Sequence, residues 1–90
     1  MTQHRVELPV PPDVAWQQLQ AAAASVGTIE GIDEATKSLV VSKRRGLGPV
    51  RLRAAVLAAG TGGASVVDIQ GGGVVSRRLI ARLVARLTHA

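Results

Sequence analysis

Five basic residues lie within the twelve-residue segment 42–53, which reads SKRRGLGPVRLR. Such side chains bind phosphates and carboxylates, lysine as a point charge and arginine through a planar fork of donors. Two glycines and a proline in the middle of the segment indicate a tight hairpin between two strands. The segment is therefore either a binding site for an anionic partner or a hairpin with solvated basic side chains. The candidate binding residues are Lys43, Arg44, Arg45, Arg51 and Arg53.

The side chains required for acid–base catalysis are few and poorly placed. His4 and His89 lie close to the two ends of the chain, where a general base is not held in position. Asp68 is the only acidic residue after position 36. It could act as a general base or as a specific partner of Arg51 or Arg53, but we interpret it as a member of a cross-strand ion pair on the open sheet face. We therefore expect no catalytic residues and no enzymatic activity.

Metal and cofactor chemistry also lacks a motif in this sequence. The chain has no cysteine, which excludes a thiolate nucleophile, a disulfide and a sulfur-ligated metal site. No spacing brings together the three or four ligands that a metal site needs. The GLG and GGG segments match neither a P-loop nor a dinucleotide-binding motif, and we interpret QGGGVVS as a hinge rather than an anion site. We expect no metal and no cofactor.

The net charge of +5 is distributed unevenly along the chain. Residues 1–36 carry a net charge of −4, whereas residues 37–90 carry +9. This division indicates either an acidic partner for the second part or pairing of the two parts within or between chains. Nine of the eleven basic residues are arginine, which a G+C-rich coding sequence would also produce. Selection for an anionic partner and coding bias both remain open.

Hydropathy patterns predict seven elements in the order strand, helix, four strands, helix. Alternation of apolar and polar residues indicates half-buried strands, most clearly in VRLRAAVLA at 50–58. A helical period between Pro12 and Gly27 indicates the first helix. The predicted strands are 5–10, 28–32, 38–44, 50–58 and 65–70, and the predicted helices are 12–26 and 74–90.

The final predicted helix has two stripes of side chains. Its apolar stripe runs through Leu79, Leu83 and Leu87, and a basic stripe lies beside it at every fourth position from Arg78 to Arg86. We interpret it as a core helix whose arginines extend to solvent, rather than as a membrane-surface helix, because the chain needs these leucines for its core. The only aromatic residue is Trp16, so the core must consist of aliphatic side chains and alanines.

These elements predict an α+β fold. Four consecutive short strands favour an antiparallel sheet, and two amphipathic helices must bury their stripes on one face of it. We therefore predict a two-layer sandwich, a five-stranded antiparallel sheet with two helices on one face, in a single domain of residues 1–90. The other sheet face stays open and carries Arg44, Arg51 and Arg53, with Lys43 and Arg45 at the tip of the hairpin.

Nothing in the sequence predicts a membrane span or a targeting segment. Apolar residues make up 47% of the chain, but the longest unbroken apolar run is far too short to cross a bilayer. The N-terminus is polar and does not resemble a signal peptide. We therefore expect a cytoplasmic protein without a transmembrane segment.

Residues 6–19, VELPVPPDVAWQQL, resemble the opening of the START/Bet v 1-like (SRPBCC, polyketide cyclase) superfamily. Those chains begin with a strand and a proline-led helix that carries a valine, a tryptophan and a leucine. The resemblance implies a truncated helix-grip fold that binds a small apolar ligand or lipid, with Trp16 as the candidate ligand residue. The element order also resembles one repeat of the TATA-binding-protein fold.

Several binding functions are consistent with these features. The leading hypothesis is a small non-enzymatic interaction module that uses its open basic sheet face for an anionic partner or for self-association. Val40, Ala55, Leu57 and Val66 would form an apolar patch on this face, which favours a homodimer. The alternatives are START-like ligand binding and non-specific nucleic-acid binding. The absence of Phe and Tyr disfavours base stacking and intercalation.

Overall fold

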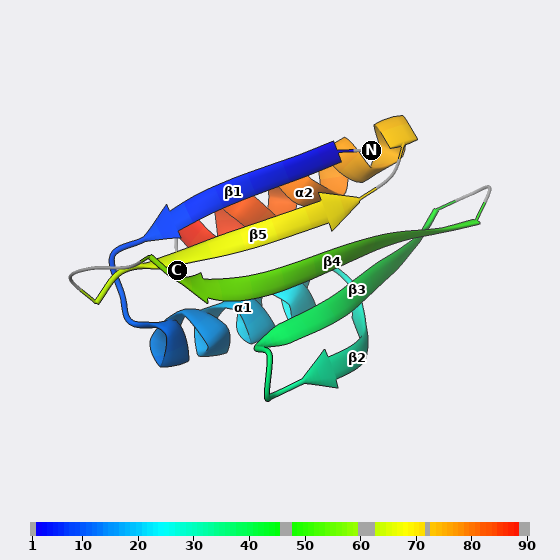
Figure 1. Cartoon of the computed structure of the whole chain (residues 1–90). Helices are drawn as coiled ribbons and strands as arrows, with labels where there is room; N and C mark the ends of the chain where they lie inside the picture. Colours follow the sequence, from blue (N-terminus) through cyan, green and yellow to red (C-terminus); the bar gives the residue numbers. More distant parts are fainter. Residues whose placement is uncertain (1, 46–47, 60–62, 72, 89–90) are drawn as a thin grey trace.

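The computed structural model describes residues 2–45, 48–59, 63–71 and 73–88, and the side chains of residues 3–44, 50–59, 63–71 and 77–88. The elements follow the predicted order, β-α-β-β-β-β-α (Figure 1). They are β1 (Thr2–Leu8), α1 (Pro12–Val26), β2 (Thr28–Asp33), β3 (Ser38–Arg45), β4 (Gly48–Ala58), β5 (Ser65–Gly71) and α2 (Gly73–Thr88).

The five strands form one antiparallel sheet in the order β1-β5-β4-β3-β2. The strands β2 to β5 form an antiparallel meander. The first strand, β1, pairs with β5 and forms the edge of the sheet on that side, with Val6 opposite Val67. Both helices lie on the same side of this sheet (Figure 1). The predicted α+β two-layer sandwich is therefore confirmed.

The apolar side chains of the strands and helices meet in one core between the two layers. Leu83 is completely buried, and the predicted stripe on α2 is confirmed because Leu79 and Leu87 are only 3% exposed. The core side chains of the sheet are Val6, Leu8, Leu39, Val41, Leu52, Ala54, Val56, Val67 and Ile69. The core side chains of α1 are Ala15, Trp16, Leu19, Ala22, Ala23 and Val26.

Two ion pairs connect the acidic first part of the chain with the basic second part. Lys37 Nζ lies 3.5 Å from Asp13 Oδ1, and Arg51 Nε lies 3.0 Å from Glu30 Oε2. The charge division seen in the sequence is thus partly compensated within one chain. The arginines of α2 take no part in these two pairs.

Gly27 forms a tight corner between α1 and the sheet. Its backbone N–H donates to the carbonyl oxygen of Ala23 and ends the helix, and the next residue, Thr28, already pairs with Ser42 of β3. A methyl group at Gly27 would overlap the backbone carbonyl oxygen of Ser42. The absence of a side chain here lets the end of α1 approach β3.

We predict that Gly27→Ala destabilises the protein by about 1–3 kcal/mol, because an added methyl group in a packed site forces the backbone apart. Gly31→Ala in β2 is the matched control, since nothing lies within 4 Å of a Cβ placed there; it should change stability by less than about 0.5 kcal/mol. Denaturant unfolding followed by circular dichroism measures both. Equal effects of the two substitutions would show that the corner is not tight.

Candidate functional site

Three of the predicted arginines lie on the side of the sheet that the helices leave uncovered. Arg51 and Arg53 are exposed, whereas Leu52 and Ala54 between and beside them are 1% and 0% exposed and face the core. Arg44 is also exposed on β3. We call this helix-free surface of the sheet the open face. Its central side chains are Arg5, Glu7, Val40, Ser42, Arg44, Arg51, Arg53, Ala55, Leu57, Val66, Asp68 and Gln70.

Lys43 does not lie at the tip of the hairpin, and that prediction was wrong. Strand β3 continues to Arg45, so Lys43 still pairs within the ladder, opposite Val50. Side chains alternate along a strand, so Lys43 shares the helix-facing side with Leu39 and Val41. The side chain of Arg45 lies outside the described residues.

Arg51 on the open face is already paired with an acid. Its Nε and one terminal nitrogen donate to the two carboxylate oxygens of Glu30 at 3.0 and 3.4 Å. The hydrogen bond from Arg51 holds the pKa of Glu30 below its ordinary value, with a further contribution from Ser42. The same bond raises the pKa of Arg51. Arg51 therefore offers less positive charge to a partner than its sequence position indicates.

The pairing of Glu30 results from an irregularity in β2 that the sequence analysis missed. The register between β2 and β3 shifts between Ile29 and Gly31, so Glu30 is an extra residue with no directly opposite partner. A glycine inside a strand is a recognised signal of such a bulge. Gly31 was therefore the available clue to the position of Glu30.

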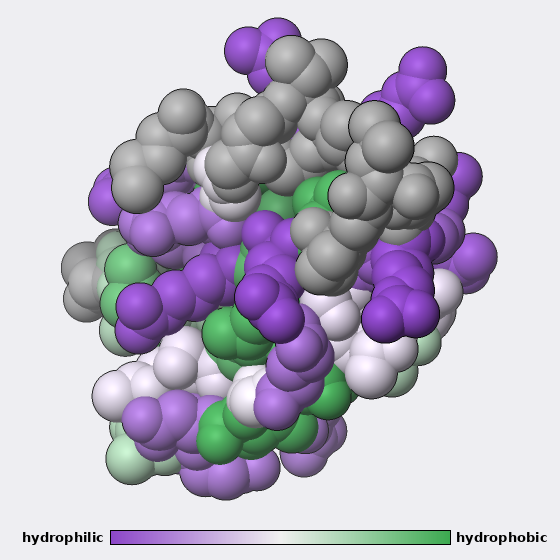
Figure 2. Space-filling view, turned by 90° about the vertical axis from the view of Figure 1, so that its right-hand side faces the viewer, coloured by the Kyte–Doolittle hydropathy of each residue, from purple (hydrophilic) through white to green (hydrophobic). Residues whose placement is uncertain are grey.

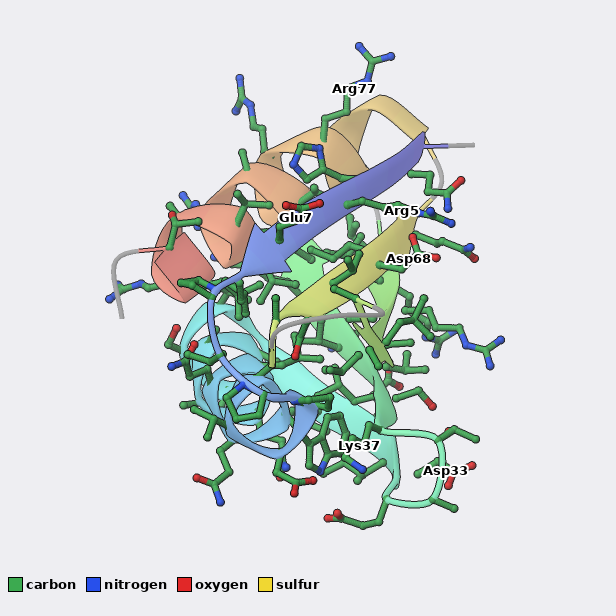
Figure 3. All side chains as sticks on the ribbon, turned by 60° about the vertical axis from the view of Figure 1, so that its left-hand side comes forward. Arg5, Glu7, Asp33, Lys37, Asp68 and Arg77 are labelled. Atoms are coloured by element: carbon green, nitrogen blue, oxygen red, sulfur yellow. The ribbon has the colours of Figure 1, made fainter. Side chains whose placement is uncertain are left out.

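Asp68 does not form the predicted cross-strand ion pair, with Arg51, Arg53 or any other described residue. The register places it opposite Ala55 on β4 and opposite Arg5 on β1. Its Oδ1 accepts a hydrogen bond from Gln3 Nε2 at 3.0 Å, and in the described part of the chain it forms no ion pair. Figure 3 shows Arg5 and Asp68 on neighbouring strands, on the side away from the helices.

The open face also has an apolar part. Leu57 is 46% exposed and lies opposite Val66. Val40, Ala55 and Val66 are each half-buried on the same face. The face therefore combines an apolar strip with side chains of both charges, rather than forming a uniformly basic surface.

Trp16 belongs to the core and not to an open ligand site. Its side chain is only 5% exposed, and its indole N–H donates to Glu34 Oε2 at 2.9 Å. The polar end of the ring has a hydrogen-bond partner, and its apolar body is packed in the core. Trp16 lines neither of the two hollows beside α2 that are described below, and its role in contacting a ligand therefore stays a prediction.

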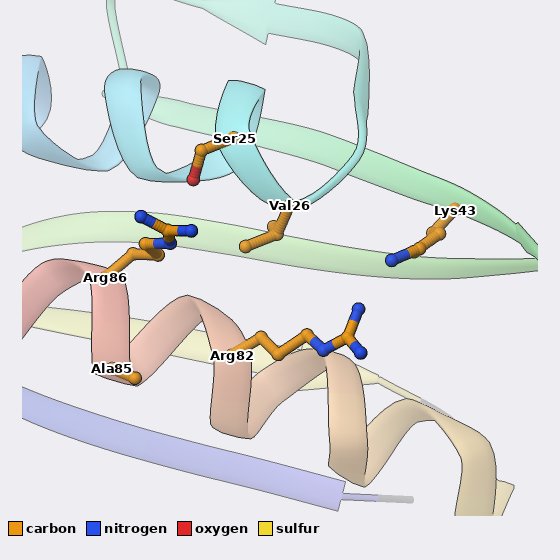
Figure 4. A pocket seen from close by; sticks show the side chains of 6 residues that line it. All are labelled: Ser25, Val26, Lys43, Arg82, Ala85 and Arg86. Atoms are coloured by element: carbon orange, nitrogen blue, oxygen red, sulfur yellow. The ribbon is translucent and has the colours of Figure 1, made fainter.

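Two hollows flank α2 on the helix layer. One, of about 250 Å3, is lined by Ser25, Val26, Lys43, Arg82, Ala85 and Arg86 (Figure 4). The other, of about 430 Å3, is lined by His4, Arg77, Ile80, Ala81, Val84 and Ala85. Figure 2 views the molecule from the end at which the β3–β4 hairpin lies, where hydrophilic side chains surround apolar atoms.

Metal ligation and membrane spanning would each require a particular feature among the residues that the structure describes. There, no three side chains of the types His, Asp or Glu gather as a metal ion would require. Neither α1 nor α2, over its described residues, is long and apolar enough to cross a membrane. His4 lies on the edge strand β1, and His89 lies outside the described residues.

No family model and no curated protein matches this chain. Function is therefore inferred from the geometry and chemistry of its surfaces.

We predict that Arg51→Gln raises the pKa of Glu30 toward its ordinary value, because the principal hydrogen bond to the carboxylate is lost. The pKa of Glu30 is lowered in the wild-type protein. The ion pair therefore contributes its full stabilisation at pH values above the ordinary pKa of a glutamate. That contribution is lost as the pH falls through the lowered pKa. NMR titration of the Glu30 side-chain carboxyl measures the shift. Arg53→Gln is the charge-matched control and should leave this pKa unchanged; a similar shift in both variants would contradict the specific pairing.

Proposed function

We propose that this chain is a small non-enzymatic interaction module that binds a second copy of itself through the open face. The observation that supports this proposal is the uncovered sheet face, on which an apolar strip lies between side chains of both charges. Leu57 has the most exposed apolar side chain of this strip. Uncovered apolar surface of this kind is typical of interaction sites.

The charges of the open face favour a second copy over a polyanion. Arg5 and Arg53 are accompanied by Glu7 and Asp68 on the same face, and the charge of Arg51 is compensated by Glu30. A polyanion would therefore meet carboxylates as well as arginines. In a two-fold dimer the same patch lies on both partners, so each arginine of one copy can approach a carboxylate of the other.

The apolar strip supplies the part of the interface that excludes water. Leu57 and Val66 are directly opposite each other on β4 and β5. Ala55 is the next side chain on this face of β4, and Val40 of β3 lies diagonal to it, opposite Arg53. Side chains of this size present a nearly flat surface. Two such surfaces can pack face to face as the sheets of a β-sandwich do.

The proposal predicts that Leu57→Asp shifts the protein from dimer to monomer and weakens self-association at least tenfold, because it buries a charge in the apolar strip. Val14→Asp is the matched control, since Val14 is similarly exposed, at 39%, but lies on α1. Sedimentation equilibrium and size-exclusion chromatography with light scattering measure the change. A wild-type chain that is monomeric at millimolar concentration, or equal effects of the two variants, would refute the proposal.

A second candidate function, binding of a small apolar ligand, is supported by the hollow between β1 and α2. Ile80, Ala81 and Val84 give this hollow an apolar wall, and Arg77 also lines it. A fatty acid would place its chain along the wall and its carboxylate near the arginine. This function would agree with the START-like resemblance of residues 6–19, although the ligand would lie on the outer side of α2 and not beside Trp16.

For this second candidate we expect Ala81→Trp to abolish fatty-acid binding by filling the hollow, whereas Ala24→Trp on the exposed side of α1 should leave it unchanged. Titration of the 15N-labelled protein with a medium-chain fatty acid would shift the amide signals of residues 80–85. Saturable shifts elsewhere, or none at the solubility limit of the ligand, would rule the hollow out as its site.

A further inference from the structure

Three basic side chains from two elements converge on the smaller hollow beside α2. Lys43 enters it from β3, and Arg82 and Arg86 enter it from α2, while Ser25 and Val26 at the end of α1 form the opposite wall. Figure 4 shows the long side chains of Lys43 and Arg82 extending toward each other across its mouth, with Arg86 facing Ser25. We call this hollow the cationic cleft.

The fold itself accounts for this convergence. Arg82 and Arg86 are four residues apart, so they lie on one side of the helix. Burial of Leu83 and Leu87 in the core turns that side toward α1. Lys43 reaches the cleft because it lies on the helix-facing side of β3.

The positive charges of Arg82 and Arg86 are not balanced by the other residues that line the cationic cleft. None of the side chains that line it is acidic. The ion pairs found among the described residues join Lys37 to Asp13 and Arg51 to Glu30, and neither pair includes Arg82 or Arg86. The C-terminal end of α1 contributes roughly half a negative charge, which is small beside the charges of these two arginines. Like charges one helical turn apart also repel each other.

We propose that the cationic cleft binds a phosphoryl group, as a phosphate monoester. Such a group carries a charge of about −1.5 to −2 at neutral pH and offers three strong acceptor oxygens. Arginine binds such oxygens through paired donors, and lysine does so as a point charge. Arg82 and Arg86 together carry two positive charges, which matches the charge of the ligand, and each offers paired donors for its oxygens.

The size and lining of the cleft favour a small polar anion. Sites for drug-sized molecules range from roughly 300 to 1,000 Å3 and are mostly apolar, whereas this cleft has about 250 Å3 and a strongly basic wall. The hydroxyl of Ser25 already donates to the carbonyl oxygen of Ala22 at 2.8 Å. We therefore assign the donors to Arg82 and Arg86, and Lys43 lines the cleft beside them.

This site is separate from the surface of the proposed function. The cleft lies in the helix layer, whereas the open face is the opposite side of the sheet. A second copy bound to the open face would leave the cleft accessible. Phosphate binding and self-association can therefore succeed or fail independently of each other.

The test uses 15N-labelled protein titrated with inorganic phosphate and with glycerol 3-phosphate at constant ionic strength. We expect saturable shifts of the amide signals of Lys43, Arg82 and Ala85. The variant Arg82→Gln/Arg86→Gln should bind at least tenfold more weakly. The variant Arg77→Gln/Arg78→Gln removes the same charge from the same helix outside the cleft, and it should bind within twofold of the wild type.

A conservative variant separates geometry from charge. Arg82→Lys/Arg86→Lys keeps the charge but loses the paired donors, and it should bind with intermediate affinity. Circular dichroism establishes that each variant is folded. If Arg77→Gln/Arg78→Gln weakens binding as much as Arg82→Gln/Arg86→Gln, or if phosphate produces no saturable shifts in the wild type, the proposal is overturned.

The source of the phosphoryl group is resolved with two further probes. Vesicles of phosphatidylcholine with and without phosphatidic acid test a lipid headgroup, and binding that requires both phosphatidic acid and the cleft arginines would support the proposal with a membrane source. A DNA duplex tests a polyanion. DNA binding that is equally sensitive to the arginines inside and outside the cleft, together with no binding of glycerol 3-phosphate, would overturn it.

Discussion

The docking of α2 on the sheet through Leu79, Leu83 and Leu87 is the interaction on which the other surfaces depend. These side chains are all but completely buried, and each contributes roughly 1.5–3 kcal/mol when it leaves water. Their burial fixes the rotation of α2 about its axis. That rotation places the exposed side chains of Arg82 and Arg86 on the side of α2 that borders α1. It also commits the helices to one side of the sheet and leaves the other side bare.

The alanines of α1 make room for this arrangement. Ala22 and Ala23 are buried on the helix, and their small side chains allow α1 and α2 to lie side by side over a sheet of only five strands. Gly27 then lets the end of α1 turn tightly toward β3. A larger residue at this corner would separate Ser25 and Val26 from Lys43 and widen the cationic cleft. The geometry of the cleft is thus set by small residues as much as by its charged ones.

Much of the fold could be predicted from local patterns, because two-residue and helical periods are properties of short segments. The alternation around Arg51 and Arg53 placed both on the open face, and the leucines of α2 identified its core side. The wrong predictions concern features that depend on contacts between separate elements. The position of Lys43 was predicted wrongly because the length of β3 depends on its pairing with β4. The pairing of Arg51 with Glu30 was missed because the position of Glu30 depends on the bulge in β2. Convergence of Lys43 with the arginines of α2 requires the tertiary docking of three elements.

The distribution of the charges bears on whether the basic excess reflects coding bias. A G+C-rich coding sequence favours arginine and explains a general surplus of it, but it does not favour lysine. The chain has only two lysines, so their positions are informative. Lys37 pairs with Asp13 next to the first turn of α1, and Lys43 lines the cationic cleft. Both lysines therefore lie beside other charged side chains, Lys37 beside an acid and Lys43 in a cleft with two arginines. Coding bias can supply the arginines, but it does not account for a lysine that lines the same cleft as Arg82 and Arg86.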